Sequence, residues 1–159
     1  MVILGYGAPM IQSEMNQLIR LNSKLLGSQA LGRFREQSVY CTARSGQKIT
    51  FTPPSEIVGT LAMVLEEFNS LIAGSETVEE ISFAMSYFWM GFIATHPFMN
   101  GNGRTAKAYL EQKAKTLGLE INLAGIDGIL LEQDPQQNIQ LLYPYFLQNL
   151  KQLSTRTTP

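Results

Sequence analysis

The sequence lacks several features that would place it in a specialised class of protein. Its 159 residues include a single cysteine, Cys41, so no internal disulfide can form, which fits a reducing compartment such as the cytoplasm. Charged residues are 16% of the chain and the formal net charge is −1, so we expect neither nucleic acid nor a membrane as a partner. No run of about 18 apolar residues occurs, which predicts that no helix crosses a membrane.

The residues that are present suit one globular domain. Apolar residues make up 45% of the sequence, and a chain of this length buries about 70% of the surface that it exposes when unfolded. We expect a single domain over residues 1–153 and a disordered tail at residues 154–159. The glycine-broken start, residues 1–9, has no basic region of the kind that begins a signal peptide, and we interpret it as a packed terminal arm.

The spacing of apolar residues predicts a mainly α-helical fold. Five segments carry apolar residues at helical spacing, and their ranges are 11–26, 53–73, 78–95, 104–117 and 139–153. The third segment begins with a capping box, Thr77 to Glu80, and is apolar on nearly every side, so we expect it to be the central buried helix. In the last segment, Pro144 predicts a kink or a restart of the helix.

Two short runs of β-branched and aromatic residues predict one β-hairpin. They are residues 39–42 and 48–52, and the loop between them contains Gly46. An isolated hairpin is only marginally stable, so we expect this one to pack against the helices. Its exposed edge could pair with an extended peptide by strand addition. Just before it, Arg33 and Arg35 are expected to lie in a solvated loop.

The stretch from His96 to Lys107 has the composition of an anion site with a base at its rim. Pro97 disfavours helical geometry at His96, the only histidine of the chain, so the central helix should end there. Gly101 and Gly103 allow the backbone to turn its N–H groups inward, and the next helix adds free N–H donors and its positive dipole end. Arg104 and Lys107 would share one face of that helix. A lone histidine in this place is also compatible with a simple cap of helix carbonyls, but the glycine-rich turn that follows favours a functional role.

The sequence His96-Pro97-Phe98-Met99-Asn100-Gly101-Asn102-Gly103-Arg104-Thr105-Ala106-Lys107 resembles the signature of the Fic (Fic/Doc) family. That signature reads His-Pro-Phe, any residue, an acidic residue, Gly-Asn-Gly-Arg, two residues, Arg. The resemblance extends over about residues 31–123, since a hairpin lies in the same place in the family. It implies a helical bundle with a central buried helix, a loop–helix anion site and one β-hairpin flap.

The resemblance also implies roles for individual residues. His96 would be the general base, Phe98 the structural anchor of the loop, and Arg104 a catalytic residue that pairs with a terminal phosphate. The implied nucleotide-binding residues are Gly101, Asn102, Gly103, Arg104 and Lys107. The implied flap residues, which would dock a target protein, are Tyr40, Thr42, Lys48, Ile49, Thr50 and Phe51.

The implied reaction is transfer of AMP from ATP, the substrate, to a Ser, Thr or Tyr hydroxyl of a target protein. Two departures bear on it. Asn100 stands where the family has a carboxylate that holds Mg²⁺, so the metal should be weakly held. Lys107 keeps the positive charge of the family's second arginine but cannot form the bidentate hydrogen bonds that an arginine makes to a phosphate. We therefore expect a weakened or altered protein adenylyltransferase.

Two alternatives to this reading remain. One is a nucleotide-binding adaptor without catalysis. The other is a Doc-like protein phosphotransferase, although Doc-type loops carry Gly-Asn-Lys-Arg where this chain has Gly-Asn-Gly-Arg.

Many Fic proteins carry an inhibitory helix in which a glutamate is followed by Gly or Asn. No glutamate of this chain is followed by either residue, so that signature is absent. An antitoxin-like inhibitor acting in trans, as in toxin–antitoxin systems, is the natural hypothesis for restraint. The apolar arm at residues 1–9 is one candidate surface for such a partner.

Overall fold

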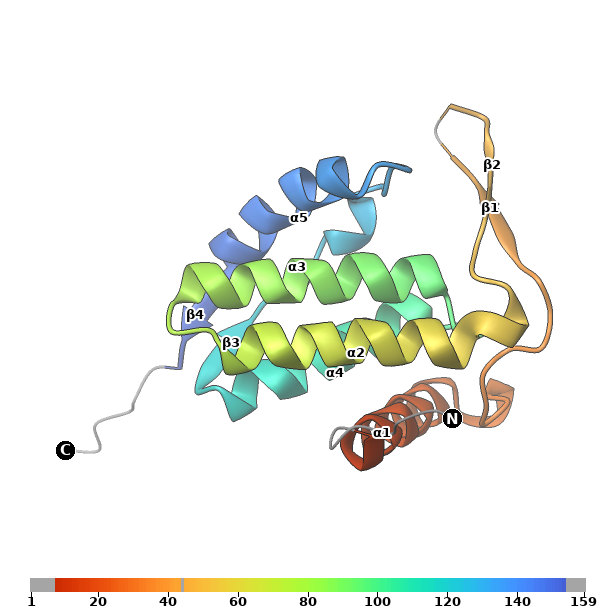
Figure 1. Ribbon diagram of the computed structural model, residues 1–159, viewed down its shortest axis with the longest axis horizontal. Helices are drawn as coiled ribbons and strands as arrows, with labels where there is room; N and C mark the ends of the chain where they lie inside the picture. Colours follow the sequence, from red (N-terminus) through yellow and green to blue (C-terminus); the bar gives the residue numbers. More distant parts are fainter. Residues whose placement is uncertain (1–7, 44, 154–159) are drawn as a thin grey trace.

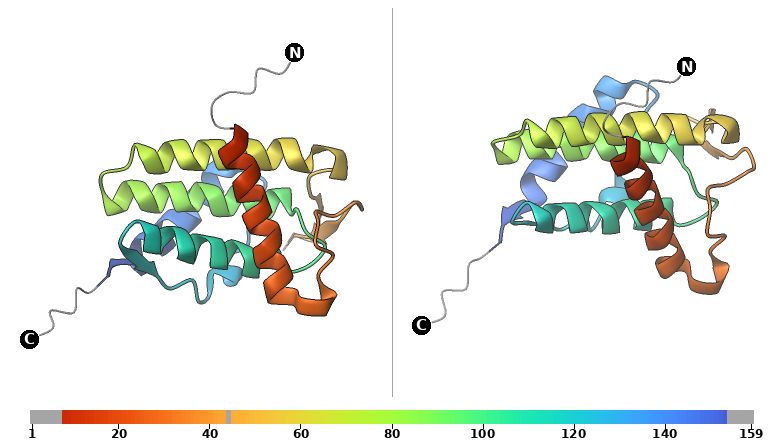
Figure 2. Two further views of the ribbon diagram at one scale, coloured as in Figure 1. Left: turned by 90° about the horizontal axis from the view of Figure 1, so that it is seen from below. Right: turned by 60° about the horizontal axis from the view of Figure 1, so that its bottom comes forward.

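The computed structural model describes residues 8–43 and 45–153 and shows a mainly helical fold, as predicted (Figure 1). Within these residues there are five α-helices: α1 (Ala8–Leu26), α2 (Ile57–Ala73), α3 (Val78–Thr95), α4 (Asn102–Thr116) and α5 (Pro135–Asn149). The helix α3 packs against α2, α4 and α5, while α1 crosses α4 and α2 (Figure 2). The prediction of α3 as the central helix is therefore confirmed.

The helix α3 begins at the predicted capping box, and large apolar side chains along it are buried, as its sequence predicts. The hydroxyl of Thr77 accepts a hydrogen bond from the backbone N–H of Glu80, and the Glu80 carboxylate accepts one from the backbone N–H of Thr77, which completes the capping box. Its residues Met85, Phe88 and Phe92 are fully buried. The apolar surface that these side chains remove from water is the main stabilising term of the fold.

The predicted hairpin is present and extends away from the helices (Figure 1). Its strands β1 (Tyr40–Thr42) and β2 (Lys48–Thr50) are antiparallel, with Cys41 opposite Ile49. Each strand has three residues, so the ladder is short. A 3₁₀ turn at Pro54–Glu56 then leads from the hairpin into α2.

The C-terminal part differs from the predicted pattern. Strands β3 (Leu119–Ile121) and β4 (Leu150–Gln152) form a second antiparallel pair, so the predicted last helix ends at Asn149 and its final residues are a strand. The helix α5 runs through Pro144 without a restart. A tertiary contact explains the strand, because residues 150–152 find backbone partners on β3 that the sequence pattern alone could not reveal.

Several segments complete the chain. Two further 3₁₀ turns lie at Gly27–Gln29 and Ile126–Gly128. The hydroxyl of Tyr145 on α5 donates to the carbonyl oxygens of Asn122 and Ala124, which anchors the segment before the second turn. The predicted terminal arm falls mostly on residues 1–7, and the predicted tail on residues 154–159, both outside the described residues. No helix in the described part of the chain has the length and apolar character needed to span a membrane.

Candidate functional site

His96 ends α3 in a conformation that few residues adopt. Its φ of 50° and ψ of 60° are left-handed, and its backbone N–H donates to the carbonyl of Phe92. Histidine is among the non-glycine residues that tolerate this region best. The turn ends the helix and sends Pro97 and Phe98 into the core, where both are buried.

The His96 ring lies against the base of the hairpin. Its centroid is 3.9 Å from that of Phe51, and the two rings are within 6° of parallel. Its Nδ1 atom is buried without a hydrogen bond to the described residues. Burial lowers the pKa of His96, the positive charge of Arg35 lowers it further, and the carbonyl of Ile93 opposes this shift. The imidazole is thus held neutral at a pH near 7, as a proton acceptor requires.

The loop after His96 is held in shape by two buried amide side chains. Asn102 accepts a hydrogen bond from the N–H of Phe98 at 2.9 Å and donates to the Phe98 carbonyl at 2.8 Å. Asn22, on α1, donates to the carbonyl of Asn100 at 2.9 Å and to the hydroxyl of Thr105 at 3.1 Å. Both amides are nearly inaccessible to solvent, so they set the path of the backbone.

Glycine is required at position 101 of this loop. Its φ of 78° is left-handed, and an added Cβ would lie about 3.1 Å from Nδ2 of Asn22. The turn at Gly101 starts α4, so the N–H groups of residues 102–104 have no acceptor within the helix. Those three donors and the positive end of the helix dipole make the N-terminus of α4 an anion site built from main chain.

Two cations and one carboxylate surround this N-terminus. Arg104 is exposed, while Lys107 forms an ion pair with Asp127. The same carboxylate lies over Gly103, because a Cβ added there would be 3.1 Å from Oδ1 of Asp127. Asp127 belongs to the 3₁₀ turn Ile126–Gly128 and was not expected in the site. The Lys107 ammonium is thus already engaged by this carboxylate.

Arg35 joins the end of α3 to the hairpin. Its guanidinium donates to the carbonyl oxygens of Thr95 and His96 at the end of the helix, and to those of Gln37 and Thr52 on either side of the hairpin. The expectation of a solvated Arg35 is wrong, because the side chain is only 2% exposed. Four carbonyl partners explain how this charge can be buried.

The neighbouring arginine, Arg33, behaves as predicted. Its side chain is 62% exposed and forms a surface ion pair with Glu36.

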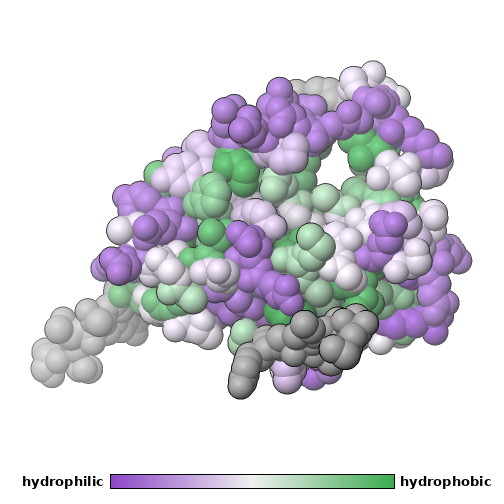
Figure 3. Space-filling model, viewed as in Figure 1, coloured by the Kyte–Doolittle hydropathy of each residue, from purple (hydrophilic) through white to green (hydrophobic). Residues whose placement is uncertain are grey.

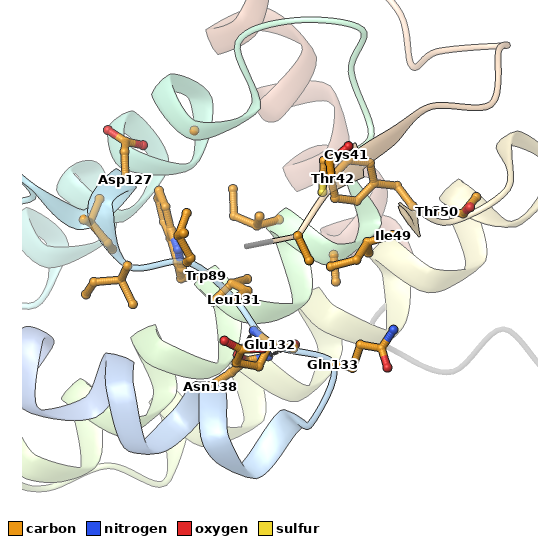
Figure 4. Close-up of a pocket in the computed structure, with 18 of the residues that line it drawn as sticks. Cys41, Thr42, Ile49, Thr50, Trp89, Asp127, Leu131, Glu132, Gln133 and Asn138 are labelled. Carbon is orange, nitrogen blue, oxygen red and sulfur yellow. Dashed lines mark hydrogen bonds between the residues drawn. The ribbon is translucent and has the colours of Figure 1, made fainter. Parts of the chain in front are cut away.

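A cavity of about 610 Å³ opens between the hairpin and the segment before α5 (Figure 3). In Figure 4, Thr42 and Ile49 of the hairpin lie on one side, Asp127 lies on the other, and Trp89 of α3 lies between them. Gly103 also lines it, so the cavity reaches the N-terminus of α4. Its walls are largely apolar, which suits the flat ring of a nucleotide base.

Of the predicted site residues, Gly103 and most of the flap residues line the cavity, whereas His96, Arg104 and Lys107 do not. The flap residues Thr42, Lys48, Ile49, Thr50 and Phe51 all line the cavity, while Tyr40 does not and is 62% exposed, with Nζ of Lys48 4.0 Å from its ring centroid. The roles assigned to these residues stay predictions. The amide of Asn102 is occupied by Phe98, so this residue can meet a phosphate only through its backbone N–H.

Three residues of the site were missed by sequence reasoning. Asn22 had a visible signal, since it interrupts the apolar face of α1. Asp127 lies between Gly125 and Gly128, in a segment too short to show the periodicity of a helix or strand. Nothing in the sequence around Arg35 distinguished it from a solvated charged residue of a loop. Each of the three acts on a segment distant in sequence, which periodicity does not report.

The donor atoms of this site do not match a magnesium site held by protein ligands alone. Asn100 offers one neutral amide oxygen on an exposed side chain, and Asp127 is engaged by Lys107. The described residues contain no group of three His, Cys, Asp or Glu side chains that could hold a metal ion. Mg²⁺ prefers carboxylate oxygens and phosphates, so any metal here would depend on a bound nucleotide.

Comparison with known proteins identifies the class of protein that this fold and site define. The model of the Fic/DOC family matches residues 13–112, which is more than half of the chain. The chain therefore belongs to the Fic/DOC family, and the resemblance seen in the sequence is confirmed. A search of curated proteins found no match.

Solved structures share the fold at low sequence identity. BepC from Bartonella tribocorum, solved with bound AMPPNP, has a TM-score of 0.70 and 17% identity over 88% of this chain and 75% of that chain. A VirB-translocated Bep effector from Bartonella quintana, solved with bound ADP, has a TM-score of 0.60 and 14% identity over 93% and 88%. A Fic domain containing signaling protein from Bacteroides thetaiotaomicron has a TM-score of 0.65 and 16% identity over 90% and 64%. The helical Fic-like fold is thus shown.

Proposed function

We propose that this protein is a Fic-type nucleotidyltransferase that transfers AMP from ATP to a Ser, Thr or Tyr hydroxyl of a target protein. The observation that carries the proposal is the environment of His96: a ring held neutral, stacked on a flap residue, at the start of the loop that leads to the N-terminus of α4. A base, an anion site and a segment that can hold a peptide are the three parts that such a transfer needs. The nucleotides bound by BepC and by the Bartonella quintana effector support the choice of substrate.

The mechanism assigns one task to each part of the site. The target hydroxyl oxygen attacks the α-phosphorus of ATP, the bond from that phosphorus to the β-phosphate bridging oxygen breaks, and pyrophosphate leaves. Nε2 of His96 accepts the hydroxyl proton. The backbone N–H groups at the start of α4 bind phosphate oxygens, and Arg104 pairs with the terminal phosphate. Lys107 contributes its charge once it leaves Asp127.

The cavity and the hairpin supply the remaining contacts in this proposal. The apolar cavity beside Trp89 would take the adenine ring, since it is continuous with Gly103 at the anion site. The hairpin would hold the target segment by strand addition, because a two-stranded sheet leaves backbone donors and acceptors free on its outer edges. An antitoxin-like protein would restrain the activity in trans.

A second candidate function, a nucleotide-binding adaptor without catalysis, is favoured by one observation. Asp127 neutralises Lys107, and Asn100 supplies no charge for a metal, so the site has fewer free charges than the family signature provides. Such a protein would bind the nucleotide and leave it intact.

The test uses ATP radiolabelled either at the α-phosphate or at the γ-phosphate, incubated with the protein and a cell lysate that supplies targets. A parallel lysate without the protein measures the labelling by its own kinases, which is subtracted. Adenylyl transfer predicts protein labelling from the α position only, lost in His96→Asn. Labelling from the γ position would support a Doc-like phosphotransferase. Binding without labelling from either position would support the adaptor.

A further inference from the structure

Arg35 connects two parts of the site that arrive from different regions of the chain. Nε donates to the carbonyl of His96 at 2.6 Å, and the same guanidinium reaches the carbonyl of Thr52, which directly follows the flap residue Phe51. Its backbone N–H also donates to the carbonyl of Pro97 at 2.8 Å. Arg35 therefore forms hydrogen bonds both to the turn at His96 and Pro97 and to Thr52, at the end of the flap.

The charge of Arg35 suits this place. The last carbonyl groups of α3 form the negative end of the helix dipole, and a cation there is stabilising. No carboxylate pairs with Arg35 among residues 8–43 and 45–153, so four main-chain carbonyl groups alone compensate it. A planar guanidinium with five donors can satisfy acceptors in several directions at once, whereas a lysine ammonium presents one point charge.

The geometry has a direct effect on the base. His96 is held in the left-handed region, where its ring direction follows from its backbone turn, and its ring stacks on Phe51. The bonds from Arg35 to His96 and Thr52 fix the backbone on both sides of that stack. Without them, the end of the flap would be tied to the end of α3 more weakly, because the hydroxyl of Thr52 donates to the carbonyl of Ala94 only at 3.5 Å.

We propose that Arg35 is a positioning residue that holds the His96 ring and the flap in one fixed relationship, so that the base and a target segment on the flap meet in reactive geometry. Arg35 itself touches neither substrate in this arrangement. The claim that Arg35 fixes the positions of the His96 ring and the flap rests on the structure alone. The claim that this raises the rate of transfer rests on the proposed function.

The geometric part is tested by proton NMR of the full chain, which has one histidine and one tryptophan. The variants are Arg35→Lys and Arg35→Gln, and the matched control is Arg33→Gln, which removes an exposed arginine two positions away. In the wild type and the control, the Phe51 ring current shifts the His96 ring signals upfield. In both Arg35 variants we expect these signals to move toward their positions in an unfolded chain while the indole signal of Trp89 stays in place.

Two NMR results would overturn the proposal. One is an unchanged His96 signal in Arg35→Lys and Arg35→Gln. The other is joint loss of the His96 and Trp89 signals in Arg35→Lys as well as in Arg35→Gln, which would make Arg35 a general stabiliser of the fold.

The catalytic part compares nucleotide binding with transfer. Arg35→Lys is expected to lower kcat for labelling at saturating ATP by about tenfold to a hundredfold, while the Kd for AMPPNP stays at the wild-type value, since Asn22 and Asn102 build the anion site independently. A parallel loss of binding and kcat would contradict a positioning role. If the wild type transfers no label at all, the proposed function fails, and the NMR result still decides the geometric claim.

Discussion

The ring of Phe51, at the base of the hairpin, lies parallel to the ring of His96 at a centroid distance of 3.9 Å. This contact places a residue of the flap on the histidine that ends α3. It excludes water from one face of the imidazole and contributes to the burial that lowers the pKa of His96.

The stability of the fold should depend on the protonation of His96. Because the pKa of His96 is lowered in the folded state, the unfolded chain binds a proton at pH values where the folded chain does not. The free energy of unfolding should therefore fall as the pH drops through about 6.5, the ordinary value for histidine, and level off below the folded-state pKa. Urea denaturation of the wild type and of His96→Asn over this range measures the effect.

Asparagine is the suitable replacement because it tolerates the left-handed backbone of position 96. His96→Ala, used as a comparison, should be less stable than His96→Asn by about 1 kcal/mol. Equal pH slopes for the wild type and His96→Asn would contradict the lowered pKa.

Asp127→Asn should strengthen nucleotide binding. The substitution removes the partner of Lys107 and a negative charge beside Gly103, so Lys107 is free to meet a phosphate. An exposed ion pair is weak, so we expect a gain of up to about fivefold in affinity for AMPPNP, measured by calorimetry at low salt. Glu120→Gln, an equal charge change at an exposed position on β3, is the control and should have no effect. A lower affinity in Asp127→Asn would show that the carboxylate assists binding.

Asn102→Ala should disrupt the loop. The amide of Asn102 is the partner of both the N–H and the carbonyl of Phe98, which are buried, so its removal leaves two polar groups unsatisfied. We expect a loss of about 2 to 3 kcal/mol in the free energy of unfolding and loss of nucleotide binding. Asn16→Ala, at an exposed position on α1, serves as the control. Unchanged stability would mean that the loop keeps its path without this amide.

Asn100→Asp should increase the dependence of the site on magnesium. A carboxylate in place of the neutral amide gives the metal the ligand type that it prefers. Binding of AMPPNP, titrated with and without Mg²⁺, should tighten with the metal in Asn100→Asp more than in the wild type or in Asn100→Ala. The absence of any metal-dependent gain would contradict our explanation of this substitution.

Much of the fold could be predicted because the signals are local. The end of α1 at Leu26, the capping box of α3 and the hairpin depend on residues close in sequence, and the structure confirms each. The pair β3–β4 was missed because its strands are three residues long and separated by all of α5. Strand pairing at that separation depends on tertiary packing.

The sequence by itself determined that a helical domain with a net charge of −1 would place one histidine before a glycine-rich turn and a new helix. Hydrophobic spacing and turn chemistry specify those features locally. Only the tertiary structure decided which polar residues surround the turn: Asn22 reaches Asn100 across 78 positions, and Arg35 reaches His96 across 61. The physical reason is that spacing reports which face of a segment is buried, whereas the partner of that face is chosen when the helices pack together.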